Sequence, residues 1–78
     1  MKEQIIAILS ELRPEFDFTQ SANFIDEGML DSFDVVALVT TLDKKFGISI
    51  NGTDIRPENF ESVEKIGALL IKNGIKSE

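Results

Sequence analysis

The chain contains no cysteine and no histidine among its 78 residues. A chain of this length buries only about 60% of the surface that its unfolded form exposes, so folds of this size often rely on disulfides or metal ions. Here disulfides are excluded, and so are metal sites built from thiolates or imidazoles. We therefore expect one domain over residues 1–78, without a metal site, that is stabilised by side-chain packing.

Three segments carry apolar residues at helical spacing. They span about residues 2–13, 32–46 and 62–73, and each has an apolar stripe that can face a shared core. Pro14 ends the first segment, and Gly47 lies where a left-handed cap residue is expected after the second. The three stripes consist of Ile5, Ile8, Leu9 and Leu12, of Val35, Leu38, Val39, Leu42 and Phe46, and of Val63, Ile66 and Leu70.

Two connections complete the predicted fold. A short helical turn is expected around residues 53–59, with Ile55 and Phe60 facing inward. Residues 14–31 form a connection that is long for a compact domain, but its apolar side chains can pin it onto the helices. The sequence thus predicts an all-α fold, a bundle of three main helices plus one short helix with a long first loop. The pinning residues are Phe16, Phe18, Phe24, Ile25 and Leu30.

The charge is acidic and uneven. Eight basic and 14 acidic residues give a net charge of −6, and residues 1–31 hold two of the basic and seven of the acidic ones. Such a surface repels phosphate backbones, so we expect no nucleic-acid partner and no anionic membrane, whereas basic patches on proteins complement it. No apolar stretch approaches the roughly 18 residues of a membrane span, and the N-terminus lacks a signal-peptide pattern. We expect a cytoplasmic protein without membrane insertion.

The residues for catalysis are missing, and we predict no enzyme and no catalytic residue. Ser32 has no histidine to activate it, and Lys44 and Lys45 lie at the far end of the same predicted helix. Asp26 and Glu27 are a possible acid–base pair, but so small a bundle has little room to enclose a substrate. The chain also has no EF-hand loop and no glycine-rich phosphate loop.

Ser32 lies at the beginning of the second predicted helix, where two interpretations are open. In one, Ser32 is only the helix N-cap, for which serine is favoured, and the protein is an unmodified helical interaction domain. In the other, Asp31 caps the helix and the Ser32 hydroxyl is exposed. A phosphodiester on that hydroxyl would lie beside unpaired backbone N–H groups and the positive end of the helix dipole.

The same helix has a second face, opposite its apolar stripe. At about 100° per residue, this face carries Phe33, Val36 and Thr40, with Ala37 beside them. Either the long loop and the short helix bury these residues, or they are exposed and meet a partner.

Three blocks of the sequence resemble a known family. Residues 24–34, Phe-Ile-Asp-Glu-Gly-Met-Leu-Asp-Ser-Phe-Asp, look like the attachment site of acyl carrier proteins and their peptidyl and aminoacyl relatives, with Leu-Asp-Ser and a large apolar residue as the motif. Residues 42–48, Leu-Asp-Lys-Lys-Phe-Gly-Ile, resemble the end of the family's second helix, and residues 59–63 resemble the entry to its last helix. The resemblance covers nearly the whole chain, in order and at matching spacing.

The resemblance implies a small antiparallel four-helix bundle and a covalent cofactor. Ser32 would carry a phosphopantetheine arm, transferred from coenzyme A by a phosphopantetheinyl transferase, with Asp31 beside it as part of the motif. The thiol of the arm would bear an acyl or aminoacyl group as a thioester. The implied partners are that transferase, a ligase that loads the acyl or aminoacyl group, and a downstream transferase or synthase. We expect the carrier to be a monomer.

One departure from the family matters for partner recognition. Carriers of fatty-acid synthesis present several acidic residues along the second helix, but here that helix has only Asp34 and Asp43, and the acidity lies in the loop before Ser32. This suggests a carrier for a specialised pathway or an aminoacyl carrier of the D-alanyl type. We predict that partners bind a surface made of Asp31, Phe33, Asp34, Val36 and Thr40.

Overall fold

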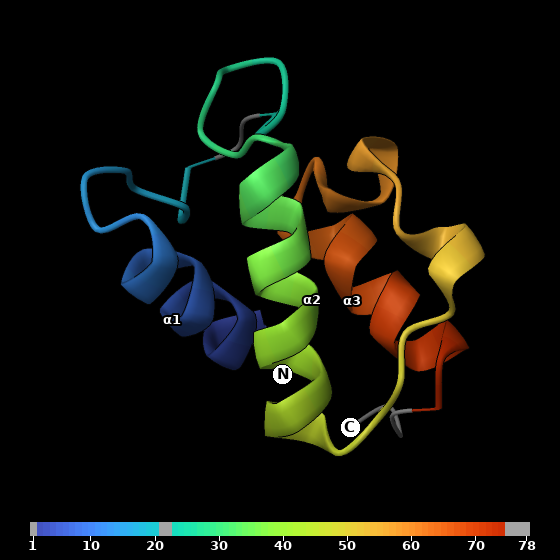
Figure 1. Cartoon of the computed structure of the whole chain (residues 1–78). Helices are drawn as coiled ribbons and strands as arrows, with labels where there is room; N and C mark the ends of the chain where they lie inside the picture. Colours follow the sequence, from blue (N-terminus) through green and yellow to red (C-terminus); the bar gives the residue numbers. More distant parts are fainter. Residues whose placement is uncertain (1, 21–22, 75–78) are drawn as a thin grey trace.

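A computed structural model describes residues 2–20 and 23–74 of the chain, and these residues form α-helices and 3-10 helices without any β-strand. In the view of Figure 1, α2 lies at the front, with α1 to its left and α3 and both 3-10 helices to its right. The all-α prediction is confirmed. In chain order the elements are α1 (Lys2–Leu12), α2 (Ser32–Phe46), η1 (Gly52–Asp54), η2 (Pro57–Phe60) and α3 (Val63–Lys72).

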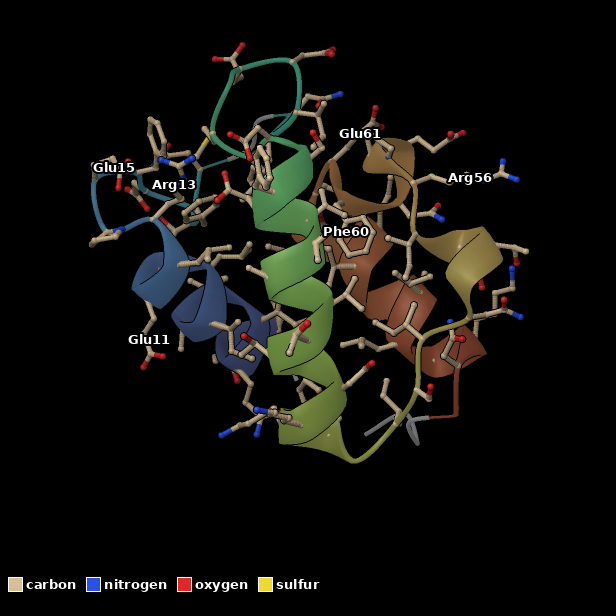
Figure 2. The ribbon with its side chains drawn as sticks, in the orientation of Figure 1. Glu11, Arg13, Glu15, Arg56, Phe60 and Glu61 are labelled. Atoms are coloured by element: carbon tan, nitrogen blue, oxygen red, sulfur yellow. The ribbon has the colours of Figure 1, made fainter. Side chains whose placement is uncertain are left out.

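The predicted apolar stripes form one core. α1 packs against both α2 and α3, and η2 packs against α3 and α2. Figure 2 shows the ring of Phe60 in the space between α2 and α3, where it is completely buried. The long first loop contributes to the same core, as predicted, so its apolar side chains pin it onto the helices. The largest fully buried side chains are those of Ile5, Leu9, Phe18, Phe24, Leu38, Leu42, Phe60, Ile66 and Leu70.

The short helix predicted around residues 53–59 is instead two separate 3-10 helices, η1 and η2. Pro57 explains the break, because a proline sterically disfavours the helical region for the residue before it. Arg56 accordingly has φ −129° and ψ 144°, an extended conformation, before the chain turns again at Pro57. Ile55 is half-buried against the core and Phe60 is fully buried, in agreement with the inward orientation predicted for both.

The ends of α2 and the connection after it are held by local hydrogen bonds. Gly47 caps the helix in the left-handed region, with φ 64°, and its amide donates to the Asp43 carbonyl. The Asp43 carboxylate also accepts a hydrogen bond from the Ile50 amide at 3.1 Å. Asp43 therefore fixes the chain as it leaves α2. None of the helices in the described ranges has the length and apolarity to cross a bilayer, and the longest, α2, has 15 residues.

Candidate functional site

α2 begins with a reciprocal cap formed by two aspartates. Asp31 is the N-cap, with φ −116° and ψ −174°, and its carboxylate accepts a hydrogen bond from the Asp34 amide at 3.0 Å. The Asp34 carboxylate in turn accepts from the Asp31 amide at 3.1 Å. This is a capping box in which aspartate takes the position usually held by glutamate or glutamine. Of the two N-caps that the sequence left open, Asp31 is the one that caps the helix.

Arg13, just after the end of α1, joins this cap. Its Nε and Nη2 atoms lie 2.9 and 2.8 Å from Asp34 Oδ2, and Nη2 lies 3.5 Å from Asp31 Oδ2. A third carboxylate, that of Glu15, lies 3.2 Å from Nη1. Figure 2 shows Arg13 and Glu15 side by side near the first turn of α2. Arg13 thus links the end of α1 to the beginning of α2.

Asp34 is the buried member of this cluster, with 8% of its surface exposed. Its burial by itself would raise the pKa of its carboxyl, but the hydrogen bonds from the Arg13 side chain and the Asp31 amide outweigh this effect and lower the pKa. The bond to Asp34 correspondingly raises the pKa of Arg13. Asp34 is therefore held as an anion, paired with a cation, under the first turn of the helix.

Ser32 is the first residue of α2 and is exposed to solvent. Because the capping box uses the amides of Asp31 and Asp34, it leaves the amides of Ser32 and Phe33, in the first turn, free of cap bonds. The positive end of the helix dipole lies at the same place. The Ser32 hydroxyl therefore has solvent access, unused amide donors and a favourable field for an anion, which together fit a phosphodiester attached to it.

The backbone before Ser32 is held in place by hydrogen bonds within the loop and to the residue that follows η2. The Phe24 carbonyl accepts hydrogen bonds from the amides of Met29 and Leu30 at 2.9 and 3.1 Å, which closes this part of the loop into a compact turn. The Phe24 amide donates to the Glu61 carbonyl, at the end of η2, at 2.8 Å. The side chains of Phe24, Met29 and Leu30 are also buried. Hydrogen bonds and packing therefore hold the segment before Ser32 against the core.

The second face of α2 is exposed, so the loop and the short helices do not bury it. Phe33 is 85% exposed and Val36 is 61% exposed, and both are among the large apolar side chains most open to solvent. Thr40 is exposed one turn further on, and its hydroxyl donates to the Val36 carbonyl at 3.1 Å. An apolar and hydroxyl-bearing surface therefore adjoins Ser32 along α2.

The structure brings most, but not all, of the predicted site residues onto this surface. Asp31, Ser32, Phe33, Val36 and Thr40 are exposed along the first half of α2. Asp34 is the exception, since it is buried beneath Arg13 and so departs from the predicted partner surface. Arg13 was not singled out by the sequence, because Arg13 and Asp34 are 21 positions apart and no periodic signal pairs them.

The acidic residues of the first loop surround this end of the molecule. Figure 1 shows the connection between α1 and α2 at the end of the bundle where α2 begins. Its acidic side chains are exposed, in contrast to Asp34, so they are accessible to a partner with basic groups. They are Glu15, Asp17, Asp26, Glu27 and Asp31.

Comparison with known proteins identifies the family of the chain. Residues 3–70 match the family model described as "Phosphopantetheine attachment site". The match includes all of α2 and extends almost to the end of α3. The chain therefore belongs to the phosphopantetheine-attachment family, whose members are carrier proteins. The resemblance stated from the sequence is confirmed, and with it the cofactor, a covalently attached phosphopantetheine, and the carrier function.

Similar curated proteins carry more specific names. Aminoacyl carrier protein 1 of Bradyrhizobium diazoefficiens is 36% identical over 55 residues, which are 70% of this chain and 60% of that protein. The D-alanyl carrier protein of Lactococcus lactis subsp. cremoris is 30% identical over 70 residues, covering 87% of this chain and 89% of the relative. That of Abiotrophia defectiva is 28% identical over 78 residues, covering 92% and 94%. No solved structure matches the chain.

Proposed function

We propose that Ser32 is the residue that carries the phosphopantetheine arm. The beginning of α2 supports this most directly. Asp31 and Asp34 cap the helix there, and the adjacent Ser32 is left exposed. The resemblance of the flanking residues 24–34 to the attachment motif of carrier proteins supports the same residue.

In the attachment reaction the Ser32 oxygen forms a new bond to the phosphorus next to pantetheine in coenzyme A. The pyrophosphate bond of coenzyme A breaks, the nucleotide part leaves with its electron pair, and the transferase removes the hydroxyl proton. The attached arm supplies a terminal thiol that holds the cargo as a thioester. The contribution of the chain itself is to hold Ser32 at the rigid beginning of α2 and to present a surface to the enzymes that act on the arm.

The proposed cargo is an aminoacyl group. The curated relatives named above are aminoacyl and D-alanyl carrier proteins. The surface of α2 is in keeping with a carrier outside fatty-acid synthesis, because α2 has only two carboxylates and both accept hydrogen bonds from within the protein. Asp34 is bonded to Arg13, and Asp43 accepts from the Ile50 amide.

The proposed partners are a phosphopantetheinyl transferase, a ligase that loads the amino acid and a downstream transferase. The surface proposed for them combines the exposed apolar residues Phe33 and Val36 with Thr40 and with Asp31 at the cap. Asp34 acts indirectly, since it holds the first turn of α2 that displays these side chains. The proposed carrier is a cytoplasmic monomer that catalyses no reaction itself.

The attachment site is tested by incubating the purified protein with coenzyme A and a promiscuous phosphopantetheinyl transferase and then measuring the intact mass. We expect the wild-type protein and Ser49→Ala to gain one phosphopantetheine, whereas Ser32→Ala gains none. Ser49 is a suitable control because it is also exposed. A gain in Ser32→Ala equal to that of the wild type would contradict the proposed site, and no gain in any protein would favour the unmodified interaction domain.

The cargo is tested on the modified protein with ATP and two enzymes, a D-alanine-activating ligase and an acyl-carrier synthetase supplied with fatty acids. We expect aminoacyl loading to be much faster than fatty-acyl loading. The loaded aminoacyl group should be released by hydroxylamine, as expected of a thioester. Efficient fatty-acyl loading without aminoacyl loading would contradict the aminoacyl assignment and leave the attachment site intact.

A further inference from the structure

Arg13 is shared among three carboxylates at the beginning of α2. Asp34 takes the shortest contacts, 2.8 and 2.9 Å, whereas Glu15 and Asp31 lie at 3.2 and 3.5 Å. One positive charge therefore faces three negative charges around the cap. The proposed phosphodiester would add a fourth negative charge at Ser32, the residue directly after Asp31.

We propose that Arg13 is the counter-charge of this phosphodiester, and so a positioning residue for the arm as well as a link between α1 and α2. This inference rests on the proposed attachment at Ser32. The Arg13 side chain is 34% exposed, so its guanidinium is accessible from solvent. Its bond to the exposed Glu15 contributes little to stability and can be given up when a stronger anion appears nearby.

Within residues 2–20 and 23–74, the other basic residues lie far from Ser32 or are engaged elsewhere. Lys65 pairs with Glu61 at 2.6 Å, and Lys72 pairs with Asp54 at 2.9 Å. Lys44 and Lys45 follow Ser32 by 12 and 13 residues on the same helix, which places them about 18–20 Å away along its axis. Lys2 lies at the opposite end of α1 and pairs with Glu64 at 3.5 Å. Charges at such separations are largely screened, because the Debye length is about 8 Å at physiological ionic strength. Arg56 points away from the bundle in Figure 2 and donates to the Thr53 carbonyl.

The test compares the melting temperature of each variant before and after attachment of the arm. Arg13→Gln should lower Tm in both forms, because it leaves the buried Asp34 unpaired, but it should lower Tm further in the modified form. We expect the additional drop to be about 2–5 °C at low salt and to shrink in 0.5 M salt, as for a partly exposed charge interaction in a small domain. Arg13→Lys should restore most of the additional drop.

Two further variants make the test independent of how well Arg13→Gln folds. Asp34→Asn retains an oxygen that can accept from the Asp31 amide, and it releases Arg13 from its main partner. The change in Tm on attachment of the arm should therefore be more positive for this variant than for the wild type. Lys2→Gln removes a positive charge at the distant end of α1 and should change Tm equally in both forms.

Two results would overturn the proposal. One is an equal loss of Tm for Arg13→Gln in the unmodified and modified forms. The other is a change in Tm on modification that is less favourable for Asp34→Asn than for the wild type. The comparison uses protein whose modification has been verified by mass. Its failure is therefore distinct from a failure of the attachment site itself.

Discussion

The exposed aromatic ring of Phe33 gives the sharpest test of how this carrier is recognised. The ring is 85% exposed in the free protein, so it contributes little to folding. If a partner enzyme buries it, the interaction gains the free energy of burying a phenylalanine side chain, roughly 2 kcal/mol, which corresponds to roughly 30-fold in binding. Phe33→Ala should thus separate partner binding from stability.

The assay measures kcat/KM of the phosphopantetheinyl transferase with the unmodified carrier as the varied substrate. We expect kcat/KM to fall by roughly 30-fold for Phe33→Ala, while the free energy of unfolding changes by no more than about 0.5 kcal/mol. Phe33→Leu, which keeps an apolar side chain, should retain most of the activity. Ile71→Ala is the matched control, because Ile71 is also an exposed apolar residue, at 46%, but lies on α3.

Two results would refute this reasoning. An unchanged kcat/KM for Phe33→Ala would show that the transferase does not bury the ring. An equal loss for Ile71→Ala would show that the effect does not depend on the surface beside Ser32.

Two further predictions concern stability. The pKa of Asp34 is lowered in the folded state, so the folded protein binds fewer protons at this residue than the unfolded protein does. The stability that Asp34 contributes is therefore present above its unfolded pKa of about 3.9 and is lost as the pH falls below that value. The gap in unfolding free energy between wild type and Asp34→Asn, measured in urea, should therefore narrow between pH 5 and pH 2, and a constant gap would be inconsistent with the Arg13–Asp34 pair. Gly47→Ala should cost about 1–2 kcal/mol because Gly47 has φ 64°. Gly52→Ala should be close to neutral, since Gly52 has no positive φ and open space around its Cα; equal costs at the two glycines in urea titrations would contradict the cap geometry.

The sequence predicts the helices well because their apolar spacing is local. Val35, Leu38 and Leu42 recur at the helical period and are all buried on one side of α2. The position of the helix start was also recognisable, but Asp31 and Ser32 are both favoured N-caps, and only the structure assigns the cap to Asp31. The break between η1 and η2 also has a local cause, Pro57, although one short helical turn was expected around residues 53–59.

Contacts between distant segments were not predictable in the same way. The Arg13–Asp34 pair and the bond from the Phe24 amide to the Glu61 carbonyl join residues far apart in the chain, and no spacing rule relates them. The burial of Asp34 depends on Arg13, so the sequence placed Asp34 on the surface with its neighbours. Whether Phe33 and Val36 are covered also depends on the path of the loops, which the structure places elsewhere.

The central claim, that the arm is attached at Ser32, is tested most directly by fragmenting the modified protein in a mass spectrometer. The added phosphopantetheine should map to Ser32 alone. The N-terminal fragment that ends at Asp31 should lack the added mass, and the one that ends at Phe33 should carry it. Attachment that maps to Ser49, or to any other hydroxyl of the chain, would contradict the account.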